Sequence, residues 1–173
     1  MEMRGGAVHG FHAGLVAVLL WTGGARAQDP ADLTSPAGGT ISGSSSHASY
    51  PVTRVFDDNR SSYWLAYNTA LPNIYVQYRF DTGGAVVNAY RLFANTVGGS
   101  ARAPKVFRFS GSFNGVDWVS LDAQTNQTAW SSGEGRLYPL WNHVPYTHYR
   151  LTISANNGDA TYTGLTDTAW SRT

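Results

Sequence analysis

Short runs of alternating apolar and polar residues, separated by clusters of turn-forming residues, make up most of this chain. In the run 73–80 every second side chain is apolar or aromatic, namely Ile74, Val76, Tyr78 and Phe80. Comparable runs occur at 85–94, 105–111, 118–121, 137–140 and 146–154, with a shorter one near 39–42. A period of two is typical of a strand with one buried face, and no window longer than about ten residues has helical periodicity. The pattern therefore predicts an all-β fold, an antiparallel β-sandwich.

The first 27 residues have the pattern of an export signal. Arg4 supplies a positive charge, residues 13–21 form an apolar stretch, and Ala25-Arg26-Ala27 matches the small-x-small cleavage pattern. A helix over the apolar stretch would be only ~14 Å long, against roughly 30 Å of hydrocarbon in a membrane. We therefore predict a signal peptide over 1–27, one domain over 28–173, no transmembrane segment, and a secreted protein (periplasmic if the organism is Gram-negative).

The charge and cysteine content of the chain limit the kinds of partner and the sources of stability to be expected. Of the 12 Lys and Arg residues, two belong to residues 1–27, as does one of the 11 acidic residues, so the predicted mature chain carries 10 of each. A surface without net positive charge argues against nucleic acid or an anionic membrane as the main partner, because both select clustered cations. The chain has no cysteine, so the domain must be stabilised without disulfides, and a bound ion is one way to add stability.

The run 55–64, Val-Phe-Asp-Asp-Asn-Arg-Ser-Ser-Tyr-Trp, brings many oxygen atoms into one short polar turn beside aromatic residues. Such a turn suits a hard cation such as calcium, which takes about six to eight oxygen ligands. Alternatively, Asp57 only stabilises the turn by accepting hydrogen bonds from backbone N–H groups. In either case the predicted role of the turn is structural.

Four segments resemble signatures of coagulation factor V/VIII type C domains, also called discoidin domains, a group that includes the family 32 carbohydrate-binding modules. They are 55–64, 103–118, 146–151 and 158–167, and they follow one another in the family's order. The resemblance implies a discoidin-like jelly-roll β-sandwich. It says much less about the ligand, because this fold serves many partners.

In that family the first signature forms a calcium site, and the resemblance implies the same site here. The implied oxygen donors are the carbonyl of Arg54, the carboxylate of Asp57, the carbonyl of Asn59, the hydroxyl and carbonyl of Ser62, the carbonyl of Thr166 and the carboxylate of Asp167. Asp58 stands where the family usually has Gly, and Asp167 where it usually has Glu. The calcium ion would tie the first turn to the final strand.

The family's binding surface is made by loops at one end of the sandwich, which the pattern places at 43–53, 65–73, 95–104, 123–136 and 155–164. Sugar recognition combines an aromatic face with polar side chains, and the candidates are His47, Tyr67, Asn68, Arg102, Trp130 and Tyr162. Trp130 is the strongest candidate of the six, because a large aromatic side chain in a hydrophilic loop is either covered by neighbouring residues or exposed to bind a partner. Trp64 and Trp118 are expected in the core. Leu65 stands where galactose-binding members often carry His, so no particular sugar is predicted.

These features predict a non-catalytic, lectin-like module that binds an extracellular or cell-surface glycan and holds a structural calcium ion. The alternative is an adhesion module that binds protein or phospholipid, because apolar side chains at loop tips also suit those partners. An enzyme is disfavoured, since the sequence has no G-x-S-x-G motif and Glu134 is the only glutamate of the predicted mature chain.

Overall fold

A computed structural model describes residues 32–34 and 38–172 of the chain, so the predicted export signal over 1–27 lies outside the described residues. Over the described part, the strands are β1 (Gly39–Gly43), β2 (Trp64–Tyr67), β3 (Ile74–Phe80), β4 (Ala89–Ala94), β5 (Pro104–Ser112), β6 (Val119–Gln124), β7 (Gly135–Pro139), β8 (His148–Asn156) and β9 (Tyr162–Ser171). Three short 3-10 helices accompany them: η1 (Val52–Phe56), η2 (Asn68–Ala70) and η3 (Ser100–Arg102). Among these residues no helix is long and apolar enough to cross a bilayer.

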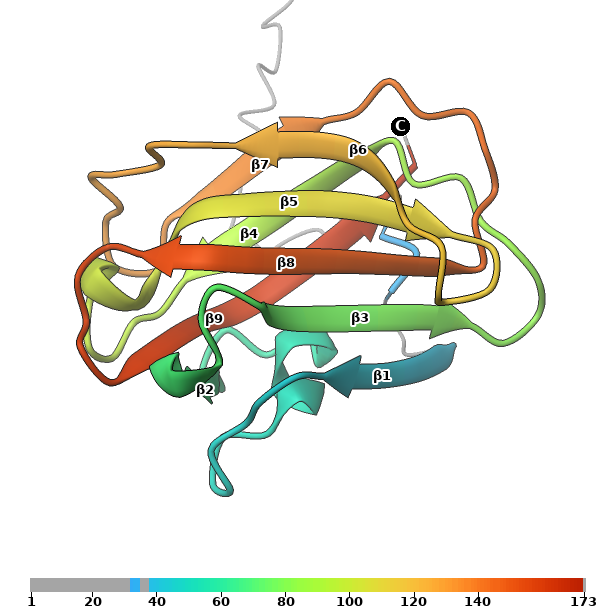
Figure 1. Cartoon of the computed structure of the whole chain (residues 1–173). Helices are drawn as coiled ribbons and strands as arrows, with labels where there is room; N and C mark the ends of the chain where they lie inside the picture. Colours follow the sequence, from blue (N-terminus) through green and yellow to red (C-terminus); the bar gives the residue numbers. More distant parts are fainter. Residues whose placement is uncertain (1–31, 35–37, 173) are drawn as a thin grey trace, which may run out of the picture.

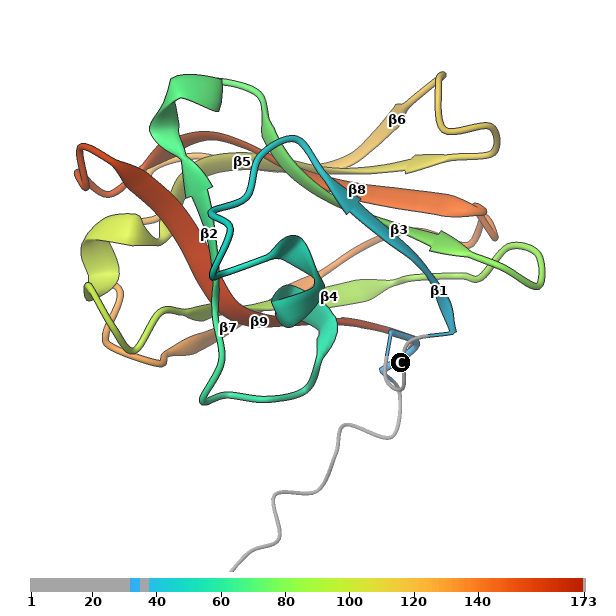
Figure 2. The same cartoon turned by 90° about the horizontal axis from the view of Figure 1, so that it is seen from below.

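The strands form two antiparallel sheets that face each other, which confirms the predicted β-sandwich. The five-stranded sheet has the order β1-β3-β8-β5-β6, and the four-stranded sheet has the order β2-β9-β4-β7. Figure 1 looks onto the five-stranded sheet, with the four-stranded sheet behind it. In Figure 2, seen from below, the two layers are viewed from the side of β1, with η1 and the loop before it beside β1 and β2.

The alternation in β3 is confirmed. Ile74, Val76 and Tyr78 are fully buried in the core, whereas the side chains between them face away from it. Trp64 is also fully buried, as predicted. The prediction for Trp118 was wrong: this side chain is only half-buried and contacts the guanidinium of Arg150 on the outer face of the sheet.

A column of stacked aromatic rings joins the two sheets across the core. Tyr90 from β4 lies 4.4 Å from Phe109 of β5, ring centre to ring centre and nearly parallel, and 5.0 Å from Tyr138 of β7. Phe109 in turn stacks on Tyr149 of β8. Trp170 of β9 meets the edge of this column, 5.1 Å from Phe109. Rings of this size bury a large apolar area, and the stacked geometry adds to the stability that burial gives.

The two ends of the described chain lie side by side. Asp32 forms an isolated bridge with Ser171, and the Leu33 N–H donates to the carbonyl of Trp170 at 2.8 Å. Tyr162, at the other end of β9, therefore belongs to the opposite end of the sandwich (Figure 1).

Replacing Phe109 with Ala should lower the free energy of unfolding by about 3–5 kcal/mol, because the change opens a cavity in the middle of the column. Urea denaturation followed by tryptophan fluorescence measures this. The matched control is Phe113→Ala, at a side chain 62% exposed, which should change stability by less than about 0.5 kcal/mol. Equal effects of the two substitutions would show that the column is not the centre of the core.

Candidate functional site

Five of the six predicted ligand residues gather at the end of the sandwich opposite the chain ends. We call His47, Tyr67, Tyr162 and Arg102 the end cluster; Asn68 lies beneath it. The ring of His47 lies 5.7 Å from that of Tyr67 and 5.9 Å from that of Tyr162, and the two tyrosine rings are 5.5 Å apart. The guanidinium carbon of Arg102 lies 5.4 Å from the centre of the Tyr162 ring. Residues separated by more than a hundred positions in the sequence thus share one surface.

Strand pairing places the two tyrosines. Tyr67 ends β2 and is the register partner of Tyr162, which begins β9. His47 is held by its backbone, whose N–H donates to Leu65 and whose carbonyl accepts from Tyr50. Tyr67 is 39% exposed and the other two rings are half-buried, so the cluster forms part of the surface.

Arg102 is fixed by an ion pair with Asp159 in the turn between β8 and β9. Its Nε lies 3.0 Å from Oδ2 of Asp159, and both side chains are 18% exposed. The other carboxylate oxygen accepts the N–H groups of Thr161 and Tyr162, each at 2.8 Å. Burial raises the pKa of Asp159, but these hydrogen bonds and Arg102 outweigh it and hold the pKa below its usual value. The end cluster is therefore electrically balanced.

Asn68 has a structural role in this arrangement. Its amide nitrogen donates to the carbonyl of Asp159 at 2.6 Å, and its side-chain oxygen accepts from the hydroxyl of Thr163 at 2.8 Å. These bonds fasten η2 to the turn that carries Asp159. Asn68 supports the end cluster from below, and its hydrogen-bonding groups are taken up by the chain.

The prediction that Trp130 offers its ring to a ligand was wrong. Trp130 is 4% exposed and belongs to the core. Its Nε1–H is shared between the carbonyls of Pro104 at 3.2 Å and Gln127 at 3.0 Å, and the guanidinium carbon of Arg136 lies 4.0 Å from the ring centre. Pro104, Gln127 and Arg136 therefore hold the ring inside the chain.

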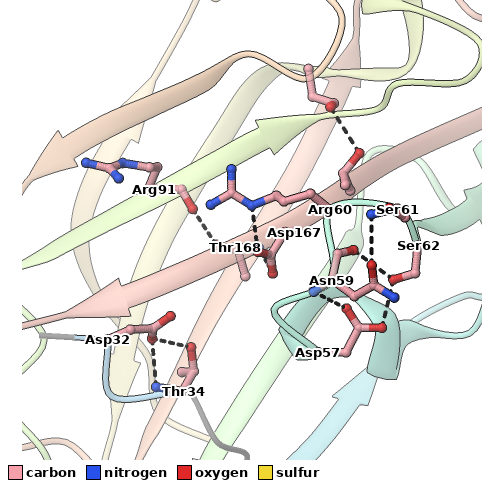
Figure 3. A network of polar contacts seen from close by, with 12 residues as sticks. Asp32, Thr34, Asp57, Asn59, Arg60, Ser61, Ser62, Arg91, Asp167 and Thr168 are labelled. Carbon is pink, nitrogen blue, oxygen red and sulfur yellow. Dashed lines mark hydrogen bonds and ion pairs between the residues drawn. The ribbon is translucent and has the colours of Figure 1, made fainter. Parts of the chain in front are cut away.

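The turn that was predicted to bind calcium is closed by its own hydrogen bonds. The Asn59 N–H donates to Oδ1 of Asp57 at 3.0 Å, and the Ser62 hydroxyl lies 2.7 Å from the other carboxylate oxygen. Asp58 adopts a positive φ of 55°, a backbone conformation that favours Gly and that Asp can adopt. Figure 3 shows this turn beside Asp167.

A guanidinium reaches the buried carboxylate of the final strand. Nε of Arg60 lies 3.1 Å from Oδ2 of Asp167, whose side chain is 4% exposed (Figure 3). The Thr168 N–H donates to the other oxygen at 2.9 Å. The pKa of Asp167 is raised to about 7: burial is the main cause of the rise, Arg60 lowers the pKa, and Asp58 raises it. The Arg60 guanidinium also lies over the Phe93 ring.

As arranged, both carboxylates of the predicted calcium site already accept hydrogen bonds from the chain. The Asp57 oxygens accept from within their own turn, and Asp167 accepts from Arg60 and from the Thr168 N–H. No group of three or more His, Cys, Asp or Glu side chains within 32–34 and 38–172 could hold a metal ion. The turn and the final strand meet as expected, through the ion pair of Arg60 with Asp167, and the calcium ion stays a prediction.

Nothing in the sequence indicates that Arg60 and Asp159 form ion pairs. Arg60 occupies a variable position of the first signature, and Asp159 is one polar residue among several in a predicted loop. Their partners, Asp167 and Arg102, lie 107 and 57 positions away. Only the folded chain identifies these pairs.

No protein-family model matches this sequence, and no curated protein matches it. Solved structures do match. The family 32 carbohydrate-binding module of NanJ from Clostridium perfringens, in complex with galactose, has a TM-score of 0.65 and 12% identity, over 78% of this chain and 94% of that one. An F5/8 type C domain from Bacteroides fragilis has a TM-score of 0.64 and 12% identity, over 76% and 89%.

The family 32 module of AlyQ, in complex with 4,5-unsaturated mannuronic acid, is similar to the same degree. Its TM-score is 0.63 at 14% identity, over 78% of this chain and 95% of that one. A truncated AlyQ with that module and an alginate lyase domain matches over 32% of its own length. These comparisons show that the chain has the fold of family 32 carbohydrate-binding modules and F5/8 type C domains.

Substituting Arg60 with Ala should lower the free energy of unfolding by about 1–3 kcal/mol, because the buried Asp167 then loses its charged partner and must either stay charged without it or take up a proton. Adding Asp167→Asn to this variant should recover part of the loss, which a double-mutant cycle measures. The control is Arg79→Ala, whose ion pair with Asp81 is about half exposed and should contribute less than about 1 kcal/mol.

Calcium provides the second half of this test. With Arg60 in place, Tm should be the same in millimolar calcium and in chelator. A rise of Tm in calcium that Asp57→Asn abolishes would contradict this expectation and support the calcium site predicted from the sequence.

Proposed function

We propose that this chain is a non-catalytic carbohydrate-binding module that holds a glycan at the end cluster. The observation that supports the proposal is the convergence of His47, Tyr67 and Tyr162 into one partly exposed aromatic surface beside Arg102. The loop end of the sandwich is also where the family resemblance places ligand binding. Solved carbohydrate-binding modules with the same fold support the proposal, although their identity to this chain is low.

The chemistry of the end cluster suits a neutral sugar. A tyrosine ring gives a flat apolar face for the C–H groups of a sugar ring, and its hydroxyl can exchange a hydrogen bond with a sugar hydroxyl. Because Asp159 balances the charge of Arg102, the surface has no excess charge that would favour an acidic ligand. Strand pairing and the ion pair hold the rings in place, so little conformational entropy is lost on binding.

Catalysis is not part of the proposal. Hydrolysis of a glycoside generally needs two carboxyl groups on either side of the bond, one of which can donate a proton. Asp159, the carboxylate bonded to Arg102, accepts three hydrogen bonds from the chain and its pKa is lowered, so it is a poor proton donor near neutral pH. The end cluster offers binding groups.

The proposal includes export and leaves calcium as a prediction. Cleavage after Ala27 would release the domain outside the cytoplasm, where extracellular or cell-surface glycans are found. The N-terminal sequence of the purified protein tests this step. Calcium is tested separately by the measurement on Arg60 and Asp57 above, since glycan binding at the end cluster does not require the ion.

Replacing Tyr67 with Ala should weaken glycan binding by about tenfold or more, because the variant loses the most exposed ring of the end cluster. A glycan array identifies a ligand, and isothermal titration calorimetry then gives its affinity. Tyr67→Phe separates the two contributions: it keeps the ring face and should retain most of the affinity.

The control is Trp141→Ala, at an aromatic side chain that is 93% exposed and lies near the other end of the sandwich. This variant should bind as the parent does. Retained glycan binding in Tyr67→Ala together with loss in Trp141→Ala would overturn the assignment of the site. Retention on phosphatidylserine vesicles, with no glycan bound on the array, would favour the phospholipid-binding alternative.

A further inference from the structure

A groove runs over the outer face of the five-stranded sheet, away from the end cluster. Its volume is about 710 Å³, within the usual range of about 300–1,000 Å³ for ligand sites. It is lined by side chains of β3, β8 and β5 that point away from the core, including Tyr75, Arg108, Arg150 and Thr152, and by Trp118. In Figure 1 these three strands lie side by side and face the viewer.

Arg150 is held firmly at the centre of this groove. Its guanidinium carbon lies 4.1 Å from the ring centres of both Tyr75 and Trp118. Its Nε and Nη2 both donate to the side-chain oxygen of Gln77, at 3.0 and 2.6 Å. The two rings and Gln77 therefore fix the plane of the guanidinium. Within the described part of the chain, no acceptor is paired with its remaining nitrogen, Nη1.

The positive charge of Arg150 has no carboxylate beside it. The lining of the groove contains two arginines, Arg108 and Arg150, and no Asp or Glu. Burial lowers the pKa of Arg150, and Tyr75 offsets this only in part. Four other arginines of the described residues, Arg60, Arg79, Arg102 and Arg136, are each paired with a carboxylate. A half-buried charge without an ionic partner lowers the stability of the fold, and a bound anion would offset this loss.

We propose that this groove is a second binding site, which takes an acidic oligosaccharide and uses the fixed guanidinium of Arg150 to bind its carboxylate or sulfate group. The site is separate from the end cluster and does not depend on the function proposed for it. An oligosaccharide fits better than a small anion, because the groove is far larger than a single anionic group.

The rest of the lining suits a sugar chain. Asn73 and Thr152 also line the groove, and they carry an amide and a hydroxyl that can form hydrogen bonds. Arg108, an exposed residue one strand away from Arg150, adds a second positive charge. Because stacking already fixes Arg150, a ligand does not have to order it, which favours binding.

The test measures binding of an oligogalacturonate, its methyl ester and a sulfated oligosaccharide of similar length by isothermal titration calorimetry. The full chain should bind at least one anionic probe, and the methyl ester about tenfold or more weakly than the free acid. Binding should weaken as salt is added. Arg150→Met should weaken binding of the anionic probe by about tenfold or more, whereas Arg79→Met, at an arginine paired with Asp81 outside the groove, should have no effect.

Two further variants keep the result clear. Arg108→Gln, at an exposed residue, should reduce binding by a smaller factor and serves if Arg150→Met does not fold. Tyr67→Ala should leave binding of the anionic probe unchanged, which separates this site from the end cluster. The proposal is overturned if no anionic probe binds, if the methyl ester binds as well as the acid, or if Tyr67→Ala abolishes binding while Arg150→Met preserves it. In that last case the function proposed for the end cluster would stand.

Discussion

The stacked rings that cross the interior are the contact on which the rest of the molecule depends. The chain has no cysteine, so the two sheets are joined by packing and hydrogen bonds alone. Tyr90 and Phe109 bring one sheet against the other, and the Tyr90 hydroxyl donates to Asp122 at 2.6 Å. The polar ends of the rings are thus satisfied where they reach the edge of the core. The loops at both ends of the sandwich are placed by this packing.

The hydrophobic pattern predicted strands that have one buried and one exposed face, but it gave no signal for β9, an inner strand of the four-stranded sheet that only the family resemblance indicated. In β3 polar side chains alternate with buried ones, and the pattern identified the strand. In β9 nearly every residue is buried, yet several are polar, including Thr166, Asp167 and Thr168. The threonine hydroxyls donate to carbonyls of β4, so their burial costs little. A buried polar strand of this kind has no periodic signal.

For the candidate sites too, some features could be predicted from the sequence and others could not. His47 and Arg102 lie between strands, as expected from the family resemblance, whereas Tyr67 and Tyr162, expected in loops, end β2 and begin β9. Whether each tryptophan is buried or exposed could not be predicted. Trp130 donates to two carbonyls inside the chain, whereas Trp118 contacts Arg150 on the outer face of the sheet. Both depend on residues distant in sequence. Arg60 likewise shows its role only when Asp167 lies beside it.

The position of the two ends of the described residues decides how this domain can be attached to a partner. Asp32 and Ser171 are neighbours, and the ten residues of β9 put roughly 30 Å between Ser171 and Tyr162. A linker, a fused protein or a solid support joined beside Ser171 would therefore leave the tyrosine surface pointing outward, toward whatever the tethered domain approaches.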